Sequence, residues 1–286
     1  MPELTPFDKL WNYSDPAGTE LKFREILDTE DTRSDLSYHL QLLTQIARTY
    51  GLRHMFSEAH ALLDEVKTAL PDQPELTHVR YHLERGRTYN SQGEKENARA
   101  EFDAALAVPE EVSNDFHTVD TMHMLAIVSQ PIPDEAIEWN MRAMQKAESS
   151  PNERAKGWLG TLYNNVGWDY FNKGEYNTAL EIFTKGLSWQ QERNREKAIV
   201  IAKWTIARTY RALGRVQEAL ELQLNLEKES KEQDGYIYEE IGECLLALDK
   251  KEESQPYFAK AYALLNEDKY LQRFEADRLK RILELS

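Results

Sequence analysis

The sequence has a single cysteine and no long apolar run. Cys244 has no second cysteine to pair with and lies in the apolar stretch 244–247, which favours a packed, unreactive thiol in a reducing compartment. No segment approaches the roughly 20 apolar residues that a membrane span needs. The first residues also lack the charged start and apolar run of a signal peptide. We therefore predict a cytoplasmic protein without a membrane partner.

Basic residues are few in comparison with acidic ones. The chain has 35 Lys and Arg against 50 Asp and Glu, which gives a formal net charge of −15. This charge opposes broad, salt-dependent binding to nucleic acid or to an anionic membrane, so nucleic acid is not a predicted partner. A local basic patch is compatible with this net charge.

Motifs of common catalytic and nucleotide-binding sites are also lacking. The chain has no phosphate-binding loop, no dinucleotide-binding glycine motif and no nucleophile elbow. His78 and His82 stand four residues apart, as paired metal ligands do, but ordinary surface or packing roles are the favoured alternative. Glu239 and Glu243 form either an acid/base pair or a solvated acidic face, and the second is favoured. We predict no catalytic residue, no metal site and no cofactor.

An internal repeat is the clearest feature that the sequence does have. A small residue is followed three positions later by an aromatic one, and another small residue comes nine positions after that. Steps of three and four lie on one helical stripe and the longer gap contains a turn, so each unit is predicted to be two antiparallel helices. The pairs are Ala47/Tyr50, Gly86/Tyr89, Gly167/Tyr170, Ala207/Tyr210 and the weaker Gly242/Leu245, and the later small residues are Ala59, Ala98, Ala179, Ala219 and Ser254.

Four positions after each later small residue, the repeat pattern predicts a large apolar residue. The position holds Leu63, Phe102, Phe183, Gln223 and Phe258, so only Gln223 breaks the apolar rule. Residues 122–143 keep the register as a degenerate unit, with residues 130–133 as its turn.

The turns between the two helices of a unit share one position. It is occupied by Gly93, Gly174 and Gly214, and by His54 and Asp249 elsewhere, and it predicts a left-handed residue that ends the first helix.

Two helix starts are marked by capping residues. Asp15 before Pro16 is one predicted cap, and Ser150, followed by Pro151 and Glu153, is another.

These residues resemble the tetratricopeptide repeat family, most clearly in residues 162–170 together with Ala179, Phe183 and Gly186. HEAT-type helix pairs have a similar period, but they do not require the small and aromatic pair. The resemblance implies an all-α fold, a right-handed superhelical solenoid of about five to seven antiparallel helix pairs with a C-terminal capping helix. We predict a divergent N-terminal helix pair in residues 1–34, repeats in 35–267 and the capping helix in 268–286.

The resemblance also implies that the first helix of each pair lines a concave groove. The positions one residue after, and three before, the first small residue include Arg48, Arg87, Asn164, Trp168, Trp204, Arg208, Glu239 and Glu243, and Asn165 and Arg211 lie close by. The predicted peptide-binding residues are Arg48, Arg87, Asn164, Asn165, Trp168, Trp204, Arg208 and Arg211. The asparagines match part of the family's clamp for chaperone tails, whose lysines are missing here.

Two interpretations of the groove residues stay open. In the first interpretation, a positive strip made by Arg48, Arg87 and Arg208 captures carboxylates, while the tryptophans hold an apolar side chain. Alternatively, the arginines pair with glutamates of neighbouring helices and the tryptophans pack between units.

The favoured function is a noncatalytic scaffold that binds a peptide or protein segment, with acidic character, in the groove. The alternative is a subunit or regulator that acts through its outer face or its ends, including as a homo-oligomer. An enzyme is the least favoured class.

Overall fold

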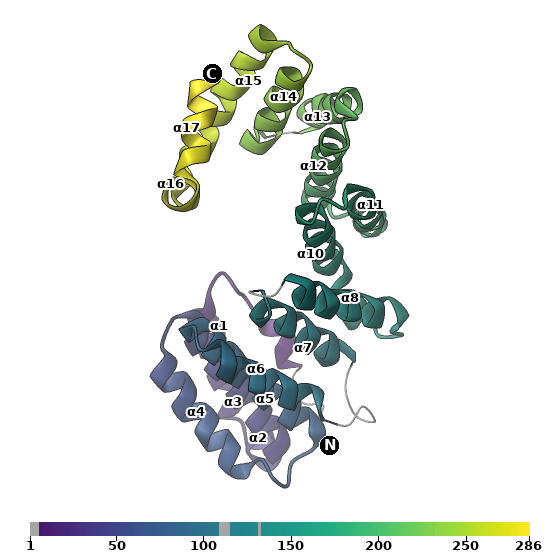
Figure 1. Cartoon of the computed structure of the whole chain (residues 1–286). Helices are drawn as coiled ribbons and strands as arrows, with labels where there is room; N and C mark the ends of the chain where they lie inside the picture. Colours follow the sequence, from purple (N-terminus) through teal and green to yellow (C-terminus); the bar gives the residue numbers. More distant parts are fainter. Residues whose placement is uncertain (1–5, 109–114, 131–132, 231) are drawn as a thin grey trace. The chain divides into compact units, whose positions relative to one another are not determined.

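The chain is helical in all the parts that the structure, a computed structural model, describes: residues 6–108, 115–130, 133–230 and 232–286 (Figure 1). It divides into two compact units, Met1–Trp158 and Leu159–Ser286. The three-part division by repeat type remains a prediction.

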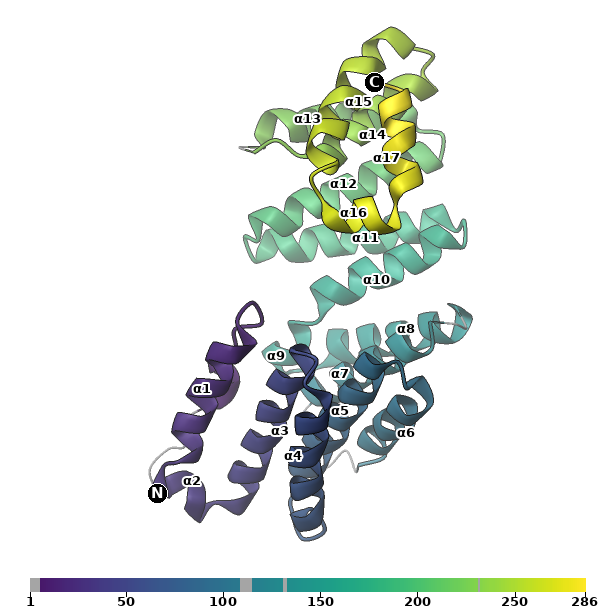
Figure 2. The ribbon, with the colours of Figure 1, turned by 90° about the vertical axis from the view of Figure 1, so that its left-hand side faces the viewer.

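The N-terminal unit consists of an entry segment (η1, α1 and α2), three helix pairs and the short helix α9. Each pair contacts the next, α1 packs against α3, and α3, α5 and α7 are in contact in that order (Figure 2). The elements are η1 (Phe7–Leu10), α1 (Pro16–Leu27), α2 (Glu30–Ser34), α3 (Leu36–Leu52), α4 (Phe56–Ala69), α5 (Glu75–Gln92), α6 (Lys95–Leu106), α7 (Asp115–Val128), α8 (Pro133–Ser149) and α9 (Glu153–Lys156).

The C-terminal unit contains three further pairs and a two-helix end. Its elements are α10 (Leu159–Asn172), α11 (Tyr176–Glu192), α12 (Glu196–Ala212), α13 (Val216–Glu229), α14 (Gly235–Ala247), α15 (Lys251–Leu265), α16 (Lys269–Phe274) and α17 (Ala276–Glu284). The described residues therefore form six pairs, α3/α4, α5/α6, α7/α8, α10/α11, α12/α13 and α14/α15, within the number that the repeat predicts.

The C-terminal cap differs in detail from the single helix that the sequence suggests. The chain leaves the helical conformation at Glu275, where φ is −131°, so the cap is α16 followed by α17, which packs against α15. Leu271, Leu279 and Ile282 are buried, but Phe274 and Leu283 are 62% and 49% exposed. The break turns part of the expected apolar stripe toward solvent.

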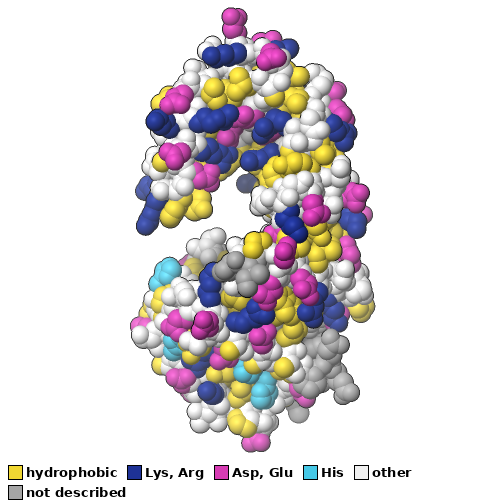
Figure 3. All heavy atoms as spheres, in the orientation of Figure 1, with side chains coloured by type: hydrophobic (Ala, Val, Ile, Leu, Met, Phe, Trp, Pro, Cys, Tyr) yellow, Lys and Arg dark blue, Asp and Glu magenta, His cyan; other side chains and the backbone are white. Residues whose placement is uncertain are grey.

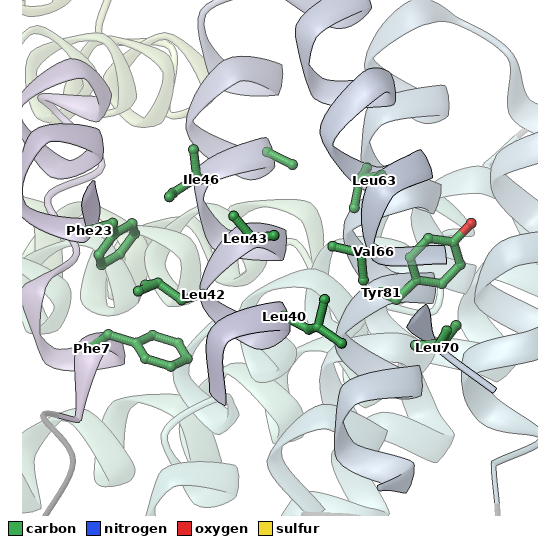
Figure 4. Close-up of a cluster of buried hydrophobic side chains, with 11 residues drawn as sticks. Phe7, Phe23, Leu40, Leu42, Leu43, Ile46, Leu63, Val66, Leu70 and Tyr81 are labelled. Atoms are coloured by element: carbon green, nitrogen blue, oxygen red, sulfur yellow. The ribbon is translucent and has the colours of Figure 1, made fainter. Parts of the chain in front are cut away.

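The core forms where one helix pair meets its neighbours. In the N-terminal unit, side chains from η1, α1, α3, α4 and α5 make one buried cluster (Figure 4). Phe7 and Phe23 enter it from the entry segment and pack edge to face at 6.2 Å. The entry segment is thus part of the hydrophobic core and is fixed relative to α3.

Small residues of the repeat make room for rings of the partner helix. A Cβ atom on Gly86 would lie 2.5 Å from the ring of Phe102, and one on Gly167 would overlap the ring of Phe183. Both phenylalanines are buried, as are Ala47 and Ala179. The register found in the sequence is therefore a packing rule: a side chain on the first helix is omitted so that a ring of the second can contact its backbone.

The turn prediction is confirmed. Gly93, Gly174 and Gly214 have φ of 86°, 80° and 77°, and His54 and Asp249 take the same left-handed conformation at 61° and 60°. The residues 131–132 of the predicted turn in the degenerate unit lie outside the described residues.

One helix-start prediction is confirmed and the other is wrong. The Asp15 carboxylate accepts the Gly18 N–H at 2.9 Å and caps α1. At the second start the cap is Asn152, because its side chain accepts the Arg154 and Ala155 N–H groups, whereas the Ser150 hydroxyl donates to Asp115 and accepts the Asn152 N–H. The Ser150 hydroxyl thus bonds to α7 and does not cap α9.

Gln223 lies fully buried at the position where three other pairs have a phenylalanine. Neither atom of its side-chain amide has a hydrogen-bond partner among the described residues. A buried polar group without a partner costs free energy that an apolar side chain does not.

We expect Gln223→Leu to raise the free energy of unfolding by about 1 to 3 kcal/mol, because the desolvated amide is removed. Urea titration followed by circular dichroism measures the change. The exposed Gln217 on the same helix is the matched control, and Gln217→Leu should change stability by less than about 0.5 kcal/mol. A Gln223→Leu protein no more stable than wild type would show that the amide is satisfied.

Candidate functional site

The predicted groove residues are divided between the two compact units. Arg48 and Arg87 belong to the N-terminal unit, and the other six belong to the C-terminal unit. Basic and acidic side chains are interspersed on the visible surface of each unit (Figure 3). The ion pairs of each predicted arginine therefore decide whether its charge is available to a partner.

Arg48 and Arg87 are bridged by one carboxylate. Glu84 of α5 accepts from Arg48 at 3.0 Å and from Arg87 at 2.7 Å, and Arg87 also pairs with Asp120 of α7. Burial raises the pKa of Glu84, but the two guanidinium groups outweigh it and lower that pKa below its usual value. In the N-terminal unit the contacts thus follow the second interpretation, in which arginines pair with carboxylates of neighbouring helices.

A hollow of about 270 Å³ opens beside this bridge. On its wall, Asp8 of η1 accepts two hydrogen bonds from Arg80, at 3.1 and 2.6 Å, and a third from Arg154 at 2.8 Å. Burial raises the pKa of Asp8, yet the ion pairs with both arginines lower it to about 2. The repeat pattern of the sequence does not point to these three residues, because none of them occupies a groove position.

The C-terminal unit brings Trp168, Trp204 and Arg208 together in what we term the tryptophan–arginine surface. The indole centroids are 6.0 Å apart, and the Arg208 guanidinium carbon lies 5.6 and 5.5 Å from the Trp168 and Trp204 rings. Both indoles are half-buried. Arg208 forms no ion pair with any residue that the structure describes. Its guanidinium group lies over ring faces instead, and its charge also acts on the Glu240 carboxylate, where burial raises the pKa and Arg208 opposes that rise.

An apolar hollow of about 210 Å³ adjoins Trp204. It is lined by Val200, Ile201, Tyr236 and Ile237 besides Trp204, and Ile201 is 56% exposed. Asp234 also lines it, and its carboxylate caps α14 by accepting the Tyr236 and Ile237 N–H groups. The Trp204 indole N–H donates to the Tyr236 carbonyl at 3.0 Å, which fixes the ring against α14.

The remaining groove positions of this unit are mostly occupied by internal ion pairs. Arg211 donates twice to Glu240, at 2.5 and 3.0 Å. Glu239 accepts from Arg278 of the cap at 2.9 Å, and Glu243 pairs with Arg281. Asn164 is exposed and Asn165 is half-buried. The two glutamates therefore hold the cap and are not a solvated acidic face.

The fold and its repeats have counterparts among known proteins. A family model described as tetratricopeptide repeat matches residues 79–111 and 160–193. The chain contains tetratricopeptide repeats. No curated protein sequence matches it.

Solved structures of low sequence identity share this tetratricopeptide fold. The apo form of RapI has a TM-score of 0.74 at 15% identity, over 92% of this chain and 76% of that one. The apo quorum sensor NprR from B. thuringiensis has a TM-score of 0.63 at 16% identity, over 98% and 79%. NprR in complex with its cognate peptide NprX gives 0.53 at 17%, over 98% and 82%. These likenesses confirm the predicted fold class.

The residues considered for other chemistry have ordinary surroundings in this repeat protein. The His82 ring faces Glu101 at 2.7 Å, and no cluster of three metal-ligating side chains occurs in the described part of the chain. Burial, with Glu240 nearby, raises the pKa of the Cys244 thiol to about 12. No helix among the described residues is long and apolar enough to cross a membrane.

We expect Asp8→Asn to lower the free energy of unfolding by about 2 kcal/mol at pH 7, because the native pKa of Asp8 is depressed from 3.8 to about 2. A depressed pKa stabilises the fold above the unfolded value, and this is lost as pH falls toward 2. The difference between variant and wild type should therefore persist down to about pH 4 and shrink below it.

Urea titrations at several pH values measure this dependence. Asp28→Asn is the control, because Asp28 is an exposed carboxylate of the same unit, 80% accessible in its side chain. A difference that stays constant down to pH 2.5 would contradict the ion-pair explanation.

Proposed function

We propose that this tetratricopeptide repeat protein is a noncatalytic scaffold that binds a peptide or protein segment on the first helices of its pairs. The tryptophan–arginine surface carries the proposal. It combines two partly accessible indoles with a guanidinium group that has no ion pair in the described chain. Tryptophan and arginine are the residues that most often dominate the free energy of protein association.

An acidic group on the partner is part of the proposal. Arg48, Arg87 and Arg211 share their charge with carboxylates of the chain, whereas the charge of Arg208 is not neutralised by an ion pair. A guanidinium group in this state suits a bidentate carboxylate. The apolar hollow beside Trp204 suits an apolar side chain next to that carboxylate.

Polar contacts to the partner's backbone are proposed for α10. Asn164 lies one turn before Trp168, and its exposed amide has both donor and acceptor groups. Asn165 is proposed to contribute at the edge of the segment bound there, and Arg48 and Arg87 are proposed to bind on the first helices of the N-terminal unit. A peptide as the partner agrees with the NprR structure, which has this fold and contains its cognate peptide.

The noncatalytic part of the proposal rests on what holds the titratable groups. Glu239 and Glu243 are engaged by the arginines of α17, and the Cys244 thiol is buried with a raised pKa. Groups held in this way maintain the structure and are poorly placed for proton transfer or nucleophilic attack.

Selection from a random peptide display library, followed by fluorescence polarisation, tests the proposal. Selected peptides should contain Asp or Glu beside an apolar residue. Arg208→Glu should weaken their binding more than Lys185→Glu, which makes the same change of net charge at an exposed position of α11. Trp204→Ala should cost about 2 kcal/mol, or about 30-fold in Kd, at low and high salt.

The comparison separates the groove from the rest of the surface. Circular dichroism confirms that each variant is folded. Equal affinities for wild type, Arg208→Glu and Trp204→Ala would move the binding site off the first helices and contradict the proposal.

Self-association is the second candidate function, favoured by the exposed end of the cap. Tyr270 and Phe274 are 61% and 62% exposed, with ring centroids 4.9 Å apart. If these rings pair with a second copy, light scattering should give a dimer mass for wild type and a monomer mass for Phe274→Glu. Leu21→Glu, at a 65% exposed position of α1, should leave the dimer intact. A monomeric wild type at high concentration would rule this candidate out.

A further inference from the structure

We infer that the hollow of the N-terminal unit is a binding site for a carboxylate attached to an apolar or aromatic group. The inference deepens the proposed function, since Arg48 and Arg87 take part in both, but it names a separate site and a ligand class. All the residues that line the hollow belong to the N-terminal unit. The tryptophan–arginine surface has no role in it.

The hollow has an excess of positive charge. Four guanidinium groups line the hollow, from Arg48, Arg80, Arg87 and Arg154, against three carboxylates, from Asp8, Glu84 and Asp120. One positive charge is left over, in a chain whose formal net charge is −15. Two of the carboxylates are each shared between two arginines. One additional anion would neutralise the group.

The hollow also contains polar groups that have no hydrogen-bond partner among the described residues. His117 is 4% exposed and lines the hollow, and neither of its ring nitrogens has a hydrogen-bond partner in the described chain. The Arg80 Nε and Trp158 Nε1 groups on the same wall are also without partners there. The last two are donors only, and a carboxylate provides acceptors only. Small rotations of these side chains would bring them to a bound carboxylate.

The state of His117 agrees with a positive hollow. Burial lowers its pKa first, and Arg80 and Arg154 lower it further, so that it falls well below the usual value. The ring is then neutral at pH 7 and keeps one donor and one acceptor.

The apolar part of the ligand follows from the aromatic walls. The Trp11 and Tyr13 rings stack at 4.9 Å with an interplanar angle of 6°, and Phe116 and Trp158 line another part of the hollow. Arg154 lies 3.8 Å from the centroid of the Phe116 ring. Aromatic surfaces beside guanidinium groups accept a flat or apolar group next to the anion.

Isothermal titration with N-acetyl-phenylalanine at low salt tests the site. N-acetyl-phenylalanine amide is the uncharged control and should bind at least about tenfold more weakly. N-acetyl-aspartyl-phenylalanine amide presents a side-chain carboxylate instead of a terminal one. The tighter of the two acids indicates whether a chain end or an acidic side chain is the natural source.

Two variants should change the affinity in opposite directions. Asp8→Asn removes the competing carboxylate from Arg80 and Arg154, so it should tighten binding of the acid about fivefold. Arg154→Gln should weaken it by a similar factor. Arg99→Gln is the matched control, because Arg99 of the same unit pairs with Asp103 and Glu135 outside the hollow, and it should have no effect.

The gain expected from Asp8→Asn keeps the test decisive, because partial unfolding does not tighten a specific site. Equal binding of acid and amide, no saturable binding of either acid up to about 10 mM, or an Asp8→Asn affinity equal to that of wild type would each overturn the inference. Arg208→Glu should leave this binding unchanged. Failure of the hollow is thus distinguishable from failure of the tryptophan–arginine surface.

Discussion

The contact between a small residue on the first helix of a pair and a ring on the second is the interaction on which the architecture depends. At Gly86 with Phe102 and at Gly167 with Phe183, the ring occupies the space where a side chain would stand. This close approach fixes the distance between the two helices and so the direction in which the next pair is added. That packing sets where the groove positions of the first helices lie.

The two units use these groove positions differently. In the N-terminal unit, Glu84 of α5 joins Arg48 of α3 to Arg87, and Arg87 pairs in turn with Asp120 of α7, so ion pairs connect the three first helices. In the C-terminal unit, Arg208 is held by indole rings in place of a carboxylate. Equivalent arginines of one repeat register thus have different charge environments. The partners proposed for the two units differ accordingly: an apolar residue beside an acidic one on the tryptophan–arginine surface, and an apolar carboxylate in the hollow.

The features that could be predicted from the sequence are those that depend on contacts between residues close together in the chain. The left-handed turn at Gly93 and the cap at Asp15 follow from backbone geometry within a few residues. The ion pair between Arg48 and Glu84 joins residues 36 positions apart, and Asp8 meets Arg154 across 146. Neither of the latter residues is in the repeat register, so no periodicity points to them. Ser150 likewise contacts a residue far away in the chain, since its hydroxyl donates to Asp115, while the side chain of Asn152 accepts the first N–H groups of α9.

Gln223 has a consequence for how the C-terminal unit comes apart. In a stack of repeats, the free energy of opening is a sum of terms from each pair and each junction, so the weakest term decides where the stack opens first. The pair α12/α13 has an amide without a partner among the described residues, where α10/α11 and α14/α15 each have a buried phenylalanine. Local opening of that pair is therefore expected to cost less free energy than opening of either neighbouring pair. Local unfolding of this kind would occur at the repeat that supplies both Trp204 and Arg208.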